Sequence, residues 1–145
     1  MGVTISSEVL ATIRAAAAAS PDAEVCGLLF GAPDQVEAAQ PCANVAADPR
    51  RAFEIDPAAL LAAYRCARQG GAMVIGHYHS HPSGQPVPSA RDAAAAMGDG
   101  ALWLIAAAGA MRAWRSDAPG AFVEEMIDAR PSGLPSARGS VGERG

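Results

Sequence analysis

Two histidines separated by one residue, His79 and His81, stand at the end of the apolar segment 73–79. Side chains alternate between the two faces of a β-strand, so this spacing puts both imidazoles on one face, where they can bind the same ion. Asp92 is the next candidate ligand, because the segment between is rich in proline and glycine and can turn the chain back toward the histidines. Two imidazoles and one carboxylate leave the fourth position of a tetrahedral zinc site to water, an arrangement typical of catalytic zinc.

The same residues also have an interpretation without metal. The histidines could be ordinary polar residues at a strand end, and Ser89 with Asp92 matches a capping box in front of an alanine-rich helix. This alternative gives no reason for two histidines in register, a stiff loop and a carboxylate within one short stretch. Capping and metal binding are also compatible, because Asp92 has two carboxylate oxygens. We therefore expect a zinc site here.

Length and charge narrow the class of protein. A chain of 145 residues, half of them hydrophobic, fits one domain with a sizeable core. The net charge of -4 and the absence of a basic cluster disfavour a nucleic-acid partner. All 11 basic residues are arginines, which excludes a lysine general base or Schiff base.

The compartment is expected to be the cytoplasm. The sequence has no signal-peptide pattern and no apolar run long enough to cross a bilayer, so no membrane association is expected. The three cysteines are widely spaced and contain no C-x-x-C pair, which fits a reducing environment better than a disulfide framework.

Helices are expected where apolar residues recur every three to four positions behind a capping residue. They cover residues 6–19, 56–69 and 89–97. Strands are expected where short apolar or alternating segments end at turn residues. They cover residues 24–31, 35–39, 42–46 (after a break at Pro41), 53–55, 73–79, 101–107 and 110–115, and residues 121–127 fit either a strand or a short helix.

These elements predict an α+β fold with a mixed, largely antiparallel sheet flanked by helices. The folded domain is expected to span residues 1–128. Proline, serine, glycine and arginine dominate residues 129–145, where apolar anchors disappear, so a disordered tail is expected there.

The segment Glu24-Val25-Cys26-Gly27-Leu28-Leu29, together with His79-Ser80-His81-Pro82, Ser89 and Asp92, resembles the JAMM motif of the MPN-domain metalloproteases. Asn44 and residues 53–57 and 76–78 also fall where small bacterial members have similar residues. The resemblance implies an MPN-like (cytidine-deaminase-like) fold. It further implies that His79, His81 and Asp92 hold Zn2+, that Glu24 is the catalytic acid/base, and that Ser89 stabilises the oxyanion. Inactive relatives lack one or more of these five residues, whereas this chain has them all. His77, a third alternating histidine, is expected to support the ligands or to face the substrate.

The resemblance implies hydrolysis of a peptide or isopeptide bond after the C-terminal Gly-Gly of a ubiquitin-like or sulfur-carrier protein. Two alternatives stay open. One is a RadC-like protein linked to DNA metabolism, because the segments 81–84 and 88–92 resemble that branch too. The other is a zinc-stabilised module that binds a ubiquitin-like partner without cleaving it. The Cys-Gly-Leu-Leu segment beside Glu24 and the missing basic face favour the hydrolase over the RadC-like protein. The sequence leaves the substrate protein and the oligomeric state open.

Overall fold

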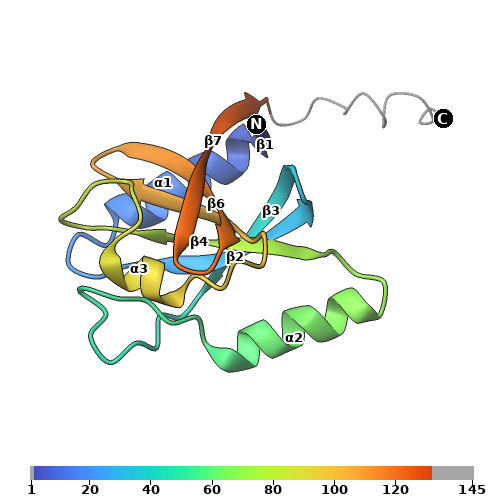
Figure 1. Ribbon diagram of the computed structural model, residues 1–145, viewed down its shortest axis with the longest axis horizontal. Coiled ribbons are helices and arrows are strands. Elements are labelled where there is room, and N and C mark those ends of the chain that lie inside the picture. Colours follow the sequence, from blue (N-terminus) through green and yellow to red (C-terminus); the bar gives the residue numbers. More distant parts are fainter. Residues whose placement is uncertain (1, 132–145) are drawn as a thin grey trace.

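The computed structural model describes residues 2–131, which form seven strands and three helices (Figure 1). In chain order they are β1 (Gly2–Ser6), α1 (Ser7–Ala18), β2 (Cys26–Ala32), β3 (Gln35–Cys42), α2 (Pro57–Arg68), β4 (Val74–Ser80), α3 (Ala90–Ala95), β5 (Leu102–Ala107), β6 (Ala110–Ala118) and β7 (Ala121–Arg130). No helix among these residues is long and apolar enough to span a membrane.

The strands form one sheet that closes into a barrel, in the order β1-β3-β2-β4-β5-β6-β7. Closure comes from β1, which pairs in parallel with both β3 and β7. The β4–β5 pair is also parallel, and the other four pairs are antiparallel. The expected α+β class with a mixed, largely antiparallel sheet is therefore confirmed. Closure of the barrel was not predicted, because nothing in the sequence of β1 shows that it pairs with both β3 and β7.

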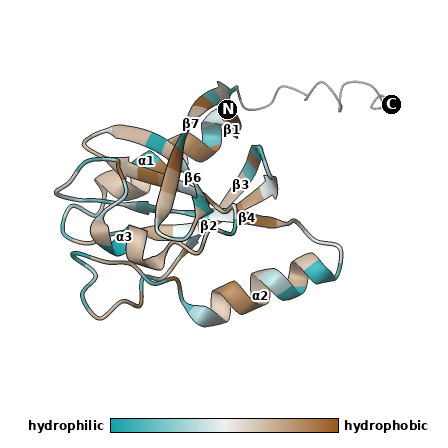
Figure 2. Ribbon diagram, in the orientation of Figure 1, coloured by the Kyte–Doolittle hydropathy of each residue, from teal (hydrophilic) through white to brown (hydrophobic). Residues whose placement is uncertain are grey.

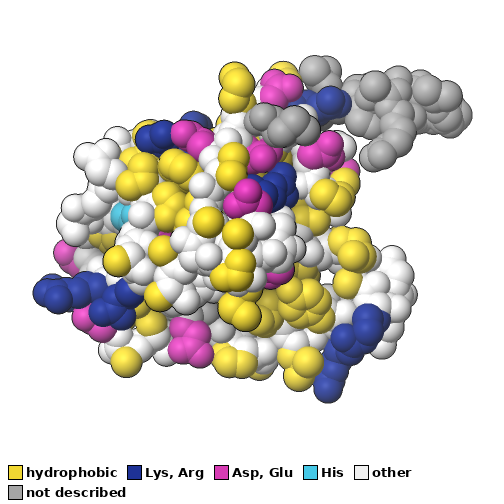
Figure 3. Space-filling model, in the orientation of Figure 1, with side chains coloured by type: hydrophobic (Ala, Val, Ile, Leu, Met, Phe, Trp, Pro, Cys, Tyr) yellow, Lys and Arg dark blue, Asp and Glu magenta, His cyan; other side chains and the backbone are white. Residues whose placement is uncertain are grey.

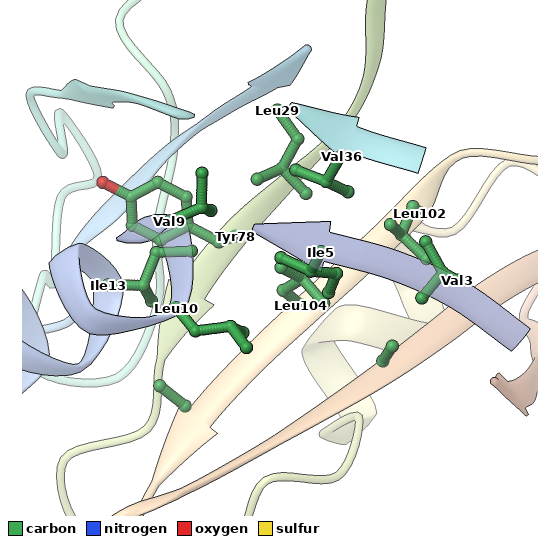
Figure 4. Close-up of a cluster of buried hydrophobic side chains, with 12 residues drawn as sticks. Val3, Ile5, Val9, Leu10, Ile13, Leu29, Val36, Tyr78, Leu102 and Leu104 are labelled. Atoms are coloured by element: carbon green, nitrogen blue, oxygen red, sulfur yellow. The ribbon is translucent and has the colours of Figure 1, made fainter. Parts of the chain in front are cut away.

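The main core lies between α1 and the barrel strands (Figure 4). Ser6 caps α1 by accepting the N–H of Glu8, as predicted, and the spacing of Val9, Leu10 and Ile13 puts these side chains on one buried face of the helix. Each fully buried aliphatic side chain contributes about 1.5–3 kcal/mol through removal of apolar surface from water. The strand residues that meet this face are Val3, Ile5, Leu29, Val36, Tyr78, Leu102, Leu104, Ala106 and Ala113.

The alternation of β4 separates this core from the candidate site. Tyr78 faces the α1 core, so its neighbours His77 and His79 point to the other face of the sheet. That is the side on which α2 lies (Figure 1). The predicted start of α2 is confirmed, since Asp56 accepts the N–H of Ala58 and Pro57 occupies the first turn. Only Ala63 of α2 is buried, and the helix carries hydrophobic and hydrophilic residues around its surface (Figure 2).

Several expected element boundaries were wrong. Residues 35–42 form one strand instead of two. β1 pairs only with Gln35 and Val36, so Pro41 lies on an open edge of β3. The strand continues through Pro41 because its missing N–H removes no hydrogen bond between strands there. Residues 53–55 form no strand, only a single bridge between Ile55 and Asn44.

Two further boundaries concern the second half of the chain. The third helix ends at Ala95 instead of residue 97. Residues 121–130 are a strand, β7, which continues two residues past the expected domain end at residue 128. The expected tail lies outside the described residues from position 132 onward.

The backbones of β4 and β5 approach each other closely at Gly76. A Cβ on Gly76 would collide with the backbone of Leu102 on the paired strand. We expect Gly76→Ala to destabilise the protein by at least about 2 kcal/mol, since a backbone collision in a paired strand must be relieved by breaking sheet hydrogen bonds. Chemical denaturation measures this. Gly2→Ala is the matched control, because its Cβ would make ordinary contacts. Equal stability of both variants would contradict the close approach.

Candidate active site

Strand register brings the predicted site residues together. In the antiparallel pairing of β2 with β4, Cys26 lies opposite His79 and Leu28 opposite His77. Glu24 lies two residues before the start of β2 and close to His81 and Asp92, whose charges act on its pKa in opposite directions. The buried carboxyl of Glu24 therefore faces the end of the histidine strand.

Three side-chain atoms converge at that end of β4. The Nε2 atoms of His79 and His81 are 3.0 Å apart, and they lie 3.2 Å and 3.1 Å from Oδ2 of Asp92. His79 is fully buried and Asp92 is 5% exposed. Among residues 2–131 these three side chains are the group of histidine, cysteine and carboxylate residues arranged to hold a metal ion.

The N-terminus of α3 holds Asp92 in place. Ser89 and Asp92 form the predicted capping box, in which the backbone N–H of Asp92 donates to Ser89 Oγ and the N–H of Ser89 donates to Asp92 Oδ2. The same Oδ2 also faces both imidazoles, so one oxygen takes part in both the capping box and the candidate metal group. Capping thus orients the carboxylate toward the histidines.

Each imidazole is oriented in a different way. His81 Nδ1 lies 2.8 Å from the carbonyl oxygen of Gln85, an acceptor that places the proton on Nδ1 and leaves Nε2 free to bind a cation. The ring of His79 stacks on Phe53, with centroids 4.2 Å apart, and meets the edge of Trp103. Its buried Nδ1 has no hydrogen-bond partner within residues 2–131. Packing therefore fixes the His79 ring.

The charges of Asp92 and His79 suit metal binding. Burial acts to raise the pKa of Asp92, but its contacts with His79 and His81 outweigh burial and hold that pKa well below its usual range. Burial lowers the pKa of His79. At His81 burial also acts to lower the pKa, but the contacts with Asp92 and the Gln85 carbonyl, together with the charge of Glu24, outweigh burial and raise that pKa. An ionised carboxylate next to a neutral buried imidazole is the form in which these groups bind metal.

The distances also fit a metal. Three atoms bound to one tetrahedral zinc at its usual bond lengths lie about 3.3 Å apart. The observed separations of 3.0–3.2 Å are close to this value. Two imidazole nitrogens and a carboxylate oxygen directed at one point repel one another unless a proton or a metal cation lies between them. The residues therefore fit a metal ion with an open fourth position.

Glu24 has the properties of a proton carrier. It is 7% exposed, and its pKa is raised from 4.5 to about 7: burial is the largest cause and Asp92 also raises it, while His81 and Arg91 act to lower it. A carboxyl with a pKa near neutrality can both accept and release a proton.

Ser80 is a residue of this site that sequence reasoning missed. Ser80 lies between the two histidines in the sequence, and its side chain is buried. Its Oγ accepts the N–H of Val25, and its own N–H donates to the Val25 carbonyl. These bonds join the histidine strand to the segment that carries Glu24. Strand alternation already put Ser80 on the face opposite the histidines, but its partner was visible only in the structure.

His77 lies beside the ligands and not among them. Its ring packs against Trp103 and Phe53, its Nδ1 is buried without a hydrogen-bond partner in the described chain, and burial lowers its pKa to about 3. It lines a groove of about 770 Å³ between α2 and the barrel, where hydrophobic side chains gather (Figure 3). The apolar part of this lining includes Ile55, Leu60, Tyr64, Met73 and Met97.

Comparison with known proteins places the chain among JAB-domain proteins. The family model described as prokaryotic homologues of the JAB domain matches residues 6–117. A desampylase of Haloferax volcanii is 44% identical over 99 residues, which cover 67% of this chain and 71% of the relative. A desampylase of Pyrococcus furiosus is 35% identical over 66% of this chain and 68% of its own length. A probable TtuB-protein conjugate cleaving protease of Thermus thermophilus is 41% identical over 40% of this chain and 39% of its own length.

Solved structures agree on the fold. A protein from Desulfitobacterium hafniense superposes with a TM-score of 0.77 at 27% identity, covering 90% of this chain and 94% of that one. A structure described as JAMM, a metalloprotease-like zinc site in the proteasome and signalosome, has a TM-score of 0.55 at 21% identity, covering 88% and 99%. The expected MPN-like fold is thus confirmed. Because the family model spans most of the chain and the Haloferax relative shares 44% of the aligned residues, the chain belongs to the prokaryotic homologues of the JAB domain.

Proposed function

We propose that this protein is a zinc-dependent isopeptidase of the JAMM type that cleaves after the C-terminal Gly-Gly of a ubiquitin-like or sulfur-carrier protein. The observation that carries the proposal is the convergence of two imidazole nitrogens and a carboxylate oxygen next to a second, buried carboxyl. The relatives named desampylase and TtuB-protein conjugate cleaving protease support the reaction and the class of substrate.

In this proposal His79, His81 and Asp92 hold the metal. Bound there, zinc would lower the pKa of a coordinated water to about 7 and polarise the scissile carbonyl. The three-residue set leaves room for that water. The neighbour described as a metalloprotease-like zinc site supports zinc as the metal.

Glu24 and Ser89 supply the remaining chemistry. Glu24 accepts the proton of the attacking water and passes it to the leaving amine, for which a pKa near 7 is well matched. Ser89 Oγ accepts the N–H of Asp92, so its own hydroxyl hydrogen can donate to the developing oxyanion. His77 lines the groove between α2 and the barrel, and in this proposal it either supports the ligands or faces the substrate.

The metal ligands are tested by metal content. His79→Ala, His81→Ala and Asp92→Ala should each lose zinc, because a site with two remaining ligands competes poorly with water. Elemental analysis of the purified variants measures this. His77→Ala is the matched control, a histidine on the same face of β4 that should keep a full complement. Full zinc in Asp92→Ala would leave Asp92 as a helix-capping residue and remove it from the ligand set.

Glu24→Gln tests the proton carrier. The amide keeps the shape of the side chain but cannot accept and release a proton near neutral pH, so turnover should fall at least about 10²- to 10⁴-fold while zinc content is unchanged. Substantial activity in this variant would show that another group activates the water.

The same variant tests the burial of Glu24 without any substrate. A carboxyl whose folded pKa lies above its unfolded value costs no stability below pH 4.5, an increasing amount between pH 4.5 and 7, and the full amount above pH 7. Metal-free Glu24→Gln should therefore melt at a higher temperature than the metal-free wild type at pH 8, and the two should converge near pH 4.5. Equal melting temperatures at both pH values would contradict a buried, ionisable Glu24.

The Gly-Gly specificity is tested on a carrier protein joined to an amino acid or peptide. Glycine lacks a Cβ, so a Gly-Gly end would pass through a channel beside the metal that is too narrow for larger residues. Replacing Gly-Gly by Ala-Ala should lower kcat/KM at least tenfold, equivalent to about 1.4 kcal/mol. Mass spectrometry locates the cleaved bond. Cleavage elsewhere, or equal rates on both substrates, would leave a hydrolase without this specificity, and binding without turnover would favour the non-catalytic module.

A further inference from the structure

Glu24 lies outside every strand, so its backbone is not held by the sheet. β2 begins at Cys26, and residues 24 and 25 have no regular secondary structure. A side chain that moves a proton must nevertheless be held to within a fraction of an ångström of its productive position. The hydrogen bonds that replace the sheet at Glu24 therefore bear directly on the chemistry.

Both backbone polar groups of Glu24 are bound by the segment 44–54. Its N–H donates to the carbonyl of Pro49 at 2.7 Å, and its carbonyl accepts from Nδ2 of Asn44 at 2.9 Å. The following residue, Val25, is held from the opposite side by Ser80. Glu24 is thus fixed between this loop and the histidine strand.

The Asn44 side chain organises that loop. Besides the Glu24 carbonyl, Nδ2 donates to the carbonyl of Ala52 at 3.0 Å, and Oδ1 accepts the N–H groups of Ala46 and Glu54, each at 3.0 Å. Two donor and two acceptor bonds saturate a side-chain amide. Asn44 thus joins both ends of the loop that carries the Pro49 carbonyl.

We propose that Asn44 is a positioning residue for Glu24: its amide folds the loop 44–54 into the shape that clamps the Glu24 backbone and so aims the carboxyl at the metal end of β4. This inference rests on the proposed function for its kinetic test. The clamp itself is a property of the hydrogen bonds and is testable without substrate. Other residue types fail here, because no other side chain of this size offers two donors and two acceptors in one plane.

The substrate-free test is amide hydrogen exchange. In Asn44→Ala the amide of Glu24 should exchange at least tenfold faster than in the wild type, because its acceptor at Pro49 loses the support of the Asn44 side chain. Arg51→Ala is the matched control from the same loop. It removes an exposed ion pair with Asp48, 3.9 Å long, and should leave this amide unchanged. Unchanged exchange in Asn44→Ala would overturn the clamp.

The kinetic test separates positioning from general loss of structure. Asn44→Ala should lower kcat about 10- to 100-fold, with KM within twofold and metal content unchanged. Introduced into Glu24→Gln, the same change should lower the residual single-turnover rate less than twofold, because the group being positioned is already gone. Equal loss in both backgrounds would overturn the role in positioning Glu24.

Asn44→Asp covers the case in which Asn44→Ala does not fold. It keeps the acceptor for Ala46 and Glu54 but loses the donors to Glu24 and Ala52, so it should show the same exchange and kinetic pattern. Wild-type exchange and turnover in Asn44→Asp would contradict the proposal. If the wild type itself cleaves no carrier conjugate, the proposed function fails, while the exchange result still decides whether Asn44 holds Glu24.

Discussion

The candidate site depends on the register of β4 between its two neighbours. With Cys26 opposite His79 on one side and Ile105 beside His79 on the other, the imidazoles are fixed on the face that also receives Glu24. A shift of one residue in this register would turn His79 and His81 into the α1 core and bring Tyr78 and Ser80 to the site. The apolar core behind β4 makes such a shift costly, so packing on one face secures the chemistry on the other.

Burial of the polar side chains of the site costs free energy of folding. Asp92, His79 and Glu24 are all buried, and transfer of such groups out of water is unfavourable unless each is paired. Asp92 is paired through the capping box and the histidines, whereas the carboxyl of Glu24 is left with a raised pKa. The uncompensated burial is therefore located at the group that would exchange a proton, which is where a perturbed pKa is useful.

Aromatic rings enclose the histidines. Phe53 stacks on His79, and Trp103 meets both His77 and His79 with its edge, while Phe122 packs behind Trp103. These contacts help to bury the His79 ring and lower the local dielectric, which strengthens the attraction between Asp92 and a bound cation. The outer side, at Ser89, stays exposed, so a substrate can approach from there.

The sequence by itself predicted the candidate site residues and most of the helices and strands. Alternation placed His79 and His81 on one face, the S-x-x-D pattern predicted the capping box of Ser89 and Asp92, and Asp56-Pro57 marked the start of α2. These features are local, because each depends on the geometry of a few consecutive residues.

Only the tertiary structure decided how distant segments meet. The sequence does not show which residues pair when these segments are distant along the chain. Examples are closure of the barrel through β1, the continuity of β3 through Pro41, the bond between Ser80 and Val25, and the four bonds of Asn44. A short strand such as β1 gains its stability from two neighbours, and a side-chain amide can satisfy its hydrogen bonds in many ways. Which of these arrangements forms depends on the packing of the whole chain, and for that reason the placement of Glu24 could not be derived from the residues around it.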